Sequence, residues 1–101
     1  VEATLGSRRI SESDTGPLTF RLSPGSIKTI GRSPGAELIL DAALVSRLHC
    51  RLEANDETLE VVDLESTNGI FVNGARVNRA HLLPGDKLKV GRVELQVGRT
   101  D

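Results

Sequence analysis

The sequence of 101 residues predicts an all-β domain, a sandwich of two antiparallel sheets. Short β-rich runs recur along the chain, and turn sequences rich in glycine, proline and asparagine separate them. No stretch has the periodicity of a long amphipathic helix. Strands at this regular spacing are typical of sandwiches and barrels. The chain has two Phe and no Trp or Tyr, so we expect Val, Leu and Ile to fill the interior.

Ten segments have the composition or alternation of strands. In chain order they are Ala3–Leu5, Leu18–Leu22, Ile27–Ile30, Glu37–Leu40, Cys50–Glu53, Leu59–Asp63, Ile70–Val72, Ala75–Val77, Leu88–Val90 and Val93–Val97. Asn73-Gly74 lies between two of them, which is the strongest short-range signal of a hairpin. Asp41–Leu48 is the best helix candidate but is short. The polar segment Gly6–Gly16 is expected to be a loose connection or a mobile hairpin tip.

Alternation within these segments predicts which side chains face the core. In Leu59–Asp63, Leu59 and Val61 share one face and Glu60 points to the other. Lys87 and Lys89 are expected to face solvent. The same rule assigns these residues to the interior: Leu88, Val90, Val93, Leu95 and Val97. Strands that are apolar on one face favour two antiparallel sheets packed face to face.

Composition argues against several functional classes. The formal net charge is −1 and the chain lacks Tyr and Trp, whereas nucleic-acid binders usually have a basic excess or aromatic stacking surfaces. Cys50 is the single cysteine, which excludes a disulfide framework within the chain and suits a reducing compartment. No apolar run is long enough to span a membrane, and the N-terminal part of the sequence lacks a signal-peptide pattern. We expect one domain over residues 1–101, excised from a longer protein because the chain starts at Val1.

Three polar clusters lie in segments expected to be loops. They are Gly31-Arg32-Ser33, Ser46-Arg47-Leu48-His49 and Ser66-Thr67-Asn68-Gly69. Together they offer two guanidinium groups, several hydroxyls and an amide, with no carboxylate inside any of the three runs. An arginine matches a phosphate with two parallel charge-assisted hydrogen bonds. The clusters therefore predict a site for a phosphate group carried by a partner.

Each of these residues also has an ordinary structural interpretation. Arg32 alone is typical of a solvated surface residue, and His49 alone is typical of a side chain that bonds loop backbone. Thr67 and Asn68 can satisfy their own turn. His81 has no polar cluster around it and is expected to be structural or exposed. These interpretations are compatible with a binding site, because such a site needs rigid loops.

An enzyme is the weaker alternative. A hydrolase could use Cys50 or Ser46 with His49, but neighbouring residues on an extended strand point to opposite sides. The sequence has no clear carboxylate to orient the histidine and no nucleophile-elbow motif. Two distant histidines and one cysteine do not have the spacing of a metal site. We therefore predict no catalytic residue, no metal and no cofactor.

The order of the clusters resembles the forkhead-associated (FHA) domain family. The matching motifs are Gly31-Arg32-Ser33, Ser46-Arg47-Leu48-His49, Ser66-Thr67-Asn68-Gly69, Val72-Asn73-Gly74, Leu82-Leu83-Pro84-Gly85-Asp86 and Val90-Gly91. The resemblance covers residues from about Leu18 to Val97. Each fragment is weak by itself, but several in this order are specific. The resemblance implies an eleven-stranded β-sandwich.

The resemblance also implies recognition of phosphothreonine in a partner segment. Arg32 and Ser46 would bind the phosphate, with Thr67 as a further contact, Arg47 beside the anion or peptide, and Asn68 fixing the peptide backbone. Residues expected to support the binding loops are Gly31, His49, Gly69, Asn73 and Gly74. In relatives the loop at 36–45 helps to choose the residue three places after the phosphothreonine. Here Leu44 and Val45 lie near the end of this loop, which leaves the preferred side chain open, with an apolar contact as one expectation.

The implied partners follow from this function. A phosphothreonine-containing protein requires an upstream Ser/Thr kinase, which suggests kinase-linked signalling in the cytoplasm, or in the nucleus if the source is eukaryotic. Neither nucleic acid nor membrane insertion is expected. The alternative is a module with the same fold that binds or assembles with partners independently of phosphate.

Overall fold

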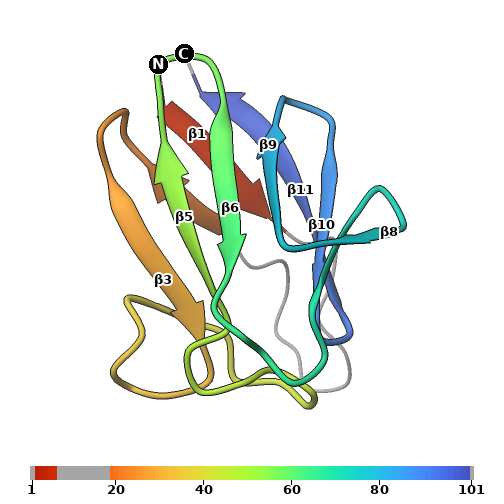
Figure 1. Ribbon diagram of the computed structural model, residues 1–101. Coiled ribbons are helices and arrows are strands. Elements are labelled where there is room, and N and C mark those ends of the chain that lie inside the picture. The colour runs from red at the N-terminus through yellow and green to blue at the C-terminus, as the bar shows by residue number, and fades with distance from the viewer. Residues whose placement is uncertain (1, 7–18, 101) are drawn as a thin grey trace.

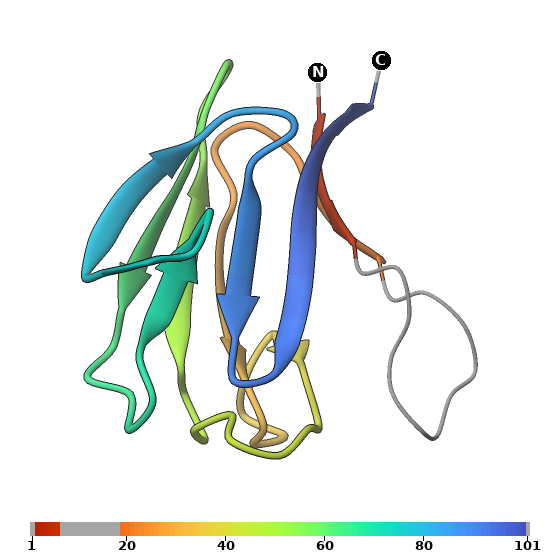
Figure 2. The ribbon, with the colours of Figure 1, turned by 90° about the vertical axis from the view of Figure 1, so that its right-hand side faces the viewer.

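Two β-sheets pack face to face in the computed structural model, which describes residues 2–6 and 19–100 and the side chains of residues 22–98 (Figures 1 and 2). The strands are β1 (Glu2–Gly6), β2 (Thr19–Leu22), β3 (Ile27–Gly31), β4 (Leu38–Ile39), β5 (Cys50–Ala54), β6 (Leu59–Asp63), β7 (Ile70–Val72), β8 (Ala75–Val77), β9 (Arg79–Leu82), β10 (Lys87–Val90) and β11 (Val93–Thr100). The all-β, two-sheet prediction is confirmed. Apart from Gly6, the connection expected at Gly6–Gly16 lies outside the described residues.

The described strands form one six-stranded and one five-stranded sheet. One sheet runs β2-β1-β11-β10-β7-β8 and the other runs β4-β3-β5-β6-β9. Every described pair is antiparallel except β3 with β4, which is parallel and aligns Ile30 with Leu38 and Gly31 with Ile39. The purely antiparallel prediction was therefore wrong at this edge. Because β4 is only two residues long and pairs with the end of β3, the short loop 32–37 is enough to bring the chain back.

Strand β9 was missing from the sequence prediction. Its sequence Arg79–Leu82 contains no β-branched residue, so nothing local favours a strand. It is extended because it pairs with β6, where the Glu60 carboxylate lies 3.4 Å from Arg79 Nε and 3.7 Å from His81 Nε2. His81 is exposed, as expected. The helix candidate at 41–48 was also wrong, since those residues form turns and bends.

Aliphatic side chains fill the space between the sheets. Leu59, Val61, Leu88 and Val90 are fully buried, which confirms the alternation derived from the sequence. The full buried cluster consists of Leu22, Ile30, Leu40, Val45, Cys50, Leu52, Ala54, Leu59, Val61, Ile70, Leu82, Leu88, Val90, Leu95 and Val97. Val93 was expected in the interior but is only partly buried, because it lies directly after the β10–β11 turn at the rim of the sandwich.

The sandwich gathers three connections at one of its ends. The loops β3–β4, β4–β5 and β6–β7 lie together at the bottom of Figures 1 and 2. The start of β1 and the end of β11 pair with each other and lie at the opposite end. The three polar clusters of the sequence therefore share one end of the molecule. No described segment forms an apolar helix long enough to cross a membrane.

Replacement of a central core residue tests this packing. Leu52 lies in the middle of β5 and is fully buried, so we expect Leu52→Ala to lower the free energy of unfolding by about 2–5 kcal/mol. Leu83→Ala is the matched control, because Leu83 is 53% exposed and should change the unfolding free energy by less than about 0.5 kcal/mol. Urea denaturation followed by circular dichroism measures both. Equal effects of the two substitutions would contradict the assigned core.

Candidate functional site

Backbone hydrogen bonds join the first two polar clusters. Beyond the end of β3, the amide of Arg32 donates to the carbonyl of Ser46 at 3.0 Å, and the amide of Ser33 donates to the carbonyl of Arg47 at 3.2 Å. On the other side, the amide of Leu40 donates to the carbonyl of Gly31 at 2.8 Å. Hydrogen bonds therefore hold the β4–β5 segment against the end of β3 at both ends of that segment, near Leu40 and near Arg47. This places Arg32 and Arg47 next to each other.

Gly31 makes this close approach of the two chains possible. A Cβ atom at position 31 would lie 1.9 Å from the carbonyl oxygen of Arg47 and 2.9 Å from the Cα of Leu48. Both neighbours are backbone atoms, so neither can move aside by a change of rotamer. A glycine is needed at this position because of space, since its φ angle is not in the left-handed region. The role of Gly31 in supporting binding loops stays a prediction, and this close backbone contact is the geometry on which it rests.

The third cluster is joined to the second by two further hydrogen bonds. The amide of Thr67 donates to Ser46 Oγ at 3.1 Å, and Asn68 Nδ2 donates to the carbonyl of Leu44 at 3.1 Å. Thr67 is exposed, whereas Ser46 and Asn68 are half-buried. The structure thus brings Arg32, Ser46 and Thr67 into one connected group, which is the arrangement that the three separate clusters required.

His49 is the buried centre of this arrangement. Its side chain is completely inaccessible to solvent. Its Nδ1 lies 3.0 Å from the amide of Ser46, and its Nε2 lies 2.8 Å from the carbonyl of Gly69. Because the amide can only donate and the carbonyl can only accept, the contacts assign a neutral imidazole with its proton on Nε2. One side chain therefore bridges the β4–β5 and β6–β7 loops, and both of its nitrogens are used.

A strained residue lies where the Asn68 side chain attaches. Leu44 has a φ angle of 69°, which is uncommon for a residue other than glycine. Such a conformation costs on the order of 1–3 kcal/mol and persists where surrounding contacts enforce it. The hydrogen bond from Asn68 to the Leu44 carbonyl is one such contact. Asn68 therefore fixes the β4–β5 loop, in addition to any contact that it makes with a ligand.

The loop at 66–69 has its own internal supports, which sequence reasoning missed. Ser66 Oγ donates to Asp63 Oδ1 at 2.6 Å and accepts the amide of Gly69 at 2.9 Å. Gly69 has a φ angle of 80°, and a Cβ atom there would lie 2.6 Å from Arg76 Nε. The Arg76 side chain therefore packs against this glycine. An aspartate three residues before a serine is a turn signal that could have identified Asp63.

Two of the predicted supporting residues lie elsewhere. Asn73 and Gly74 form the β7–β8 turn with φ angles of 50° and 90°, at the other end of β7 from Gly69. Asn73 Oδ1 accepts the amide of Lys87 at 3.0 Å, and its Nδ2 donates to Asp86 Oδ1 at 3.2 Å. These hydrogen bonds fix the hairpin to β10 instead of holding the binding loops directly.

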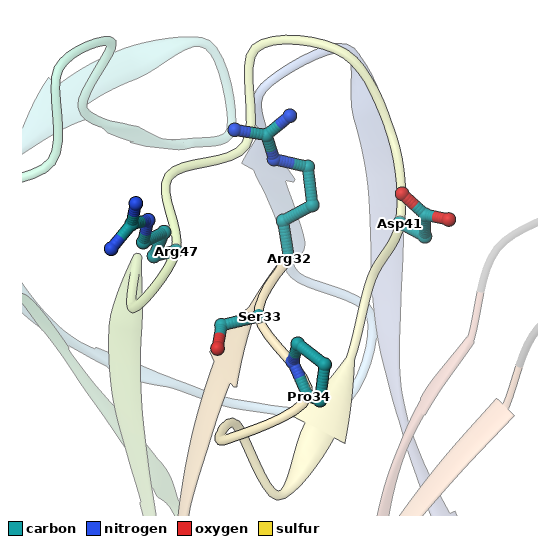
Figure 3. A pocket seen from close by; sticks show the side chains of 5 residues that line it. All are labelled: Arg32, Ser33, Pro34, Asp41 and Arg47. Carbon is teal, nitrogen blue, oxygen red and sulfur yellow. The ribbon is translucent and has the colours of Figure 1, made fainter.

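A cavity of about 410 Å³ opens around Arg32. It is lined by Arg32, Ser33, Pro34, Asp41 and Arg47 (Figure 3). Figure 3 shows Arg32 inside an arch formed by the β4–β5 segment, with Arg47 on one limb and Asp41 on the other. The two arginines make the cavity suitable for an anion. Asp41 was not selected from the sequence, because it lies outside the three clusters.

Cys50 and His49 do not form a catalytic pair in this structure. Burial, and secondarily the negative charge of Asp63, raises the pKa of Cys50 to about 12, so the nucleophilic thiolate is disfavoured. His49 uses both ring nitrogens for backbone contacts. Among the described residues, no group of three or more His, Cys, Asp or Glu side chains is placed to hold a metal ion.

Comparison with known proteins identifies the family. The profile of the FHA domain matches residues 28–91, which contain all three clusters. The chain belongs to the FHA domain family. It is similar to the ABC transporter ATP-binding/permease protein Rv1747 of Mycobacterium tuberculosis, with 40% identity over 80 residues, and to the oxoglutarate dehydrogenase inhibitor of Corynebacterium efficiens, with 39% identity over 67 residues. These matches cover 79% and 66% of this FHA domain chain.

A solved structure supports the same assignment. It comes from a structural and functional analysis of phosphothreonine-dependent FHA domain interactions and shares 32% identity with this chain at a TM-score of 0.83. The match covers 100% of this FHA chain and 99% of the other. In contrast, the matches span only 9% of the Rv1747 transporter and 47% of the C. efficiens inhibitor. The similarity to those two proteins is therefore one of domains.

Gly31→Ala tests the backbone contact that joins the loops. The added methyl group would overlap the carbonyl of Arg47, so we expect a loss of about 1–3 kcal/mol in unfolding free energy and shifted amide resonances at Arg47 and Leu48. Gly35→Ala is the control, since its Cβ would meet only Ser33 Oγ at an ordinary 3.5 Å. Urea denaturation and amide NMR spectra measure both effects. Unchanged Arg47 and Leu48 resonances in Gly31→Ala would refute the contact.

Proposed function

We propose that this FHA domain binds phosphothreonine-containing segments of partner proteins in kinase-linked signalling. The observation that carries the proposal is the connected group in which Arg32 bonds to Ser46 through the backbone and Ser46 Oγ accepts the amide of Thr67. Three loops thereby present cationic and hydroxyl groups at one end of the sandwich. The related structure with 32% identity comes from work on phosphothreonine-dependent interactions.

In this proposal Arg32, Arg47 and Ser46 hold the phosphate. Phosphothreonine carries a charge of about −1.5 to −2 and three acceptor oxygens, which suits two guanidinium groups and a hydroxyl donor. Both arginines are exposed and line the same cavity. Ser46 Oγ already accepts the Thr67 amide, which leaves its hydroxyl proton free to donate to a phosphate oxygen. Unphosphorylated threonine would offer none of these charged contacts.

Thr67 and Asn68 complete the proposed site. The exposed Thr67 hydroxyl is a further donor to the phosphate. Asn68 uses one Nδ2 hydrogen on Leu44, so its second amide hydrogen and its Oδ1 can bond the main chain of an extended peptide. Leu44 is 47% exposed and can make the apolar side-chain contact expected from the sequence. Val45 is buried and therefore cannot, which corrects that part of the expectation.

The proposed role is binding without catalysis. The partner is a protein phosphorylated by a Ser/Thr kinase, with no nucleic acid and no inserted membrane segment involved. We place the domain in the cytoplasm, or in the nucleus if the source is eukaryotic, because those compartments contain such kinases and suit a free Cys50 thiol.

Arg32→Ala should remove most of the phosphate-dependent affinity. Truncating one partner of a close charge pair commonly costs about 2–5 kcal/mol of binding free energy. Titration calorimetry with a phosphothreonine peptide chosen from a phosphopeptide library measures this loss. Arg79→Ala is the matched control, because Arg79 is an exposed arginine on β9 that pairs with Glu60, outside the three loops. Near-normal affinity of Arg32→Ala would exclude Arg32 from the site.

The same titrations separate the alternative, a module that binds or assembles independently of phosphate. Such a module would bind its partner equally well with threonine or phosphothreonine, and Arg32→Ala would leave binding unchanged. The intact set of Arg32, Ser46, Thr67 and Asn68 favours the phosphate-dependent function over this alternative.

Phosphothreonine should bind more tightly than phosphoserine. The two ligands differ by one methyl group, and a fitted pocket gains about 1–3 kcal/mol from such a group. We therefore expect at least about tenfold tighter binding of the phosphothreonine peptide than of its phosphoserine counterpart. Fluorescence anisotropy with two peptides of otherwise identical sequence measures the ratio, and the unphosphorylated peptide serves as the baseline. Coincident titration curves for the two phosphopeptides would refute the methyl contact.

A further inference from the structure

Asp41 is the one acidic residue among the five that line the cavity around Arg32, and Figure 3 shows its carboxylate on the outer side of its limb, turned away from Arg32. We propose that Asp41 makes this FHA domain select segments that carry a lysine or arginine within a few residues of the phosphothreonine. The inference rests on the proposed function, because it assigns a charge preference to the same ligand. It makes Asp41 a specificity-determining residue.

Backbone hydrogen bonds fix Asp41 and Arg47 on opposite sides of Arg32. The limb that carries Asp41 is held through the bond from the Leu40 amide to the Gly31 carbonyl at 2.8 Å. The limb that carries Arg47 is held through the bond from the Ser33 amide to the Arg47 carbonyl at 3.2 Å. Figure 3 shows the same arrangement, with Arg32 between the two limbs. The positive and negative ends of the cavity are thus built into the fold.

The charges of the cavity are uncompensated within the described part of the chain. Asp41, Arg32 and Arg47 are exposed, and none of them takes part in an ion pair between described side chains. A phosphate is attracted by the two guanidinium groups and repelled by the carboxylate, so it should lie on the Arg47 side of the cavity. A ligand that continues from the phosphate across the limb of Asp41 would then pass the Asp41 carboxylate. A cationic side chain there would be attracted and an anionic one repelled.

The separation of the segments that carry Asp41 and Arg47 suits an extended peptide. Asp41 and Arg47 lie on the two segments that flank the end of β3, and neighbouring strands are separated by about 4.8 Å. Two such spacings are about 10 Å, which an extended chain covers with only a few residues at about 3.3 Å each. A ligand with its phosphate at Arg47 can therefore place a lysine or arginine near Asp41 without distortion.

The test uses the 101-residue chain and a set of phosphothreonine peptides. Each position flanking the phosphothreonine is occupied in turn by lysine, glutamine or glutamate, and affinities are measured by fluorescence anisotropy. At one or more positions we expect the peptide with lysine to bind about fivefold more tightly than the peptide with glutamate. This ratio is the combined effect of attraction and repulsion at an exposed carboxylate. In Asp41→Asn this ratio should fall below about twofold. The wild-type preference should also weaken as the salt concentration rises.

Asp56→Asn is the matched control. Asp56 is an exposed aspartate in the β5–β6 turn, at the far end of β5 from the cavity, so the ratio should stay at its wild-type value. An unchanged ratio in Asp41→Asn, or a wild type that is indifferent to lysine and glutamate at every position, overturns the inference and leaves the proposed function standing. Binding that does not depend on phosphorylation at all overturns the proposed function as well.

Discussion

The close approach of Gly31 to the backbone of Arg47 is the constraint on which the rest of the site depends. Because residue 31 has no Cβ, the β4–β5 segment can lie directly against the end of β3. The amides of Arg32 and Ser33 then find acceptors on that segment, and Arg32 and Arg47 come to line one cavity. A charge pair of equal sign is unfavourable by itself, so backbone contacts must hold these guanidinium groups together before any anion binds.

His49 extends the same constraint to the third loop. It is a buried polar side chain, which is costly unless its hydrogen bonds are complete, and here both nitrogens bond to loop backbone. The bridge sets the position of Gly69 relative to Ser46 and thereby the position of Thr67 relative to Arg32. Loops that are already ordered lose little conformational entropy on binding, so more of the interaction energy with a ligand becomes affinity.

Sequence reasoning predicted the parts of this domain that depend on local patterns. Alternation identified the core faces of β6 and β10, and the clusters around Arg32, Ser46 and Thr67 identified the three loops. It failed where tertiary pairing decides the structure. Strand β9 is extended because β6 lies beside it, and β4 is parallel because it pairs only with the last two residues of β3. Asp41 directly follows a predicted strand and begins the short helix candidate, and only the arch of the β4–β5 segment brings it to the rim of the cavity around Arg32.

The opposite sheet also contributes to the shape of the site. Gly91, in the β10–β11 turn, has a φ angle of 63°, and a Cβ atom there would lie 2.9 Å from Val45 Cγ2 and 3.0 Å from the carbonyl oxygen of Ala43. The turn of one sheet therefore supports the loop that belongs to the other. Leu44 is held between this turn and the Asn68 side chain, which explains how its left-handed conformation persists.

Because the arch is braced at its base by Gly31 and near its middle by Gly91 and Asn68, Asp41 and Arg47 remain on separate limbs. Because Asp41 and the two arginines are held apart, the site can distinguish ligands by the order of positive and negative groups along them. A flexible loop would let Asp41 pair with an arginine, and this discrimination would be lost.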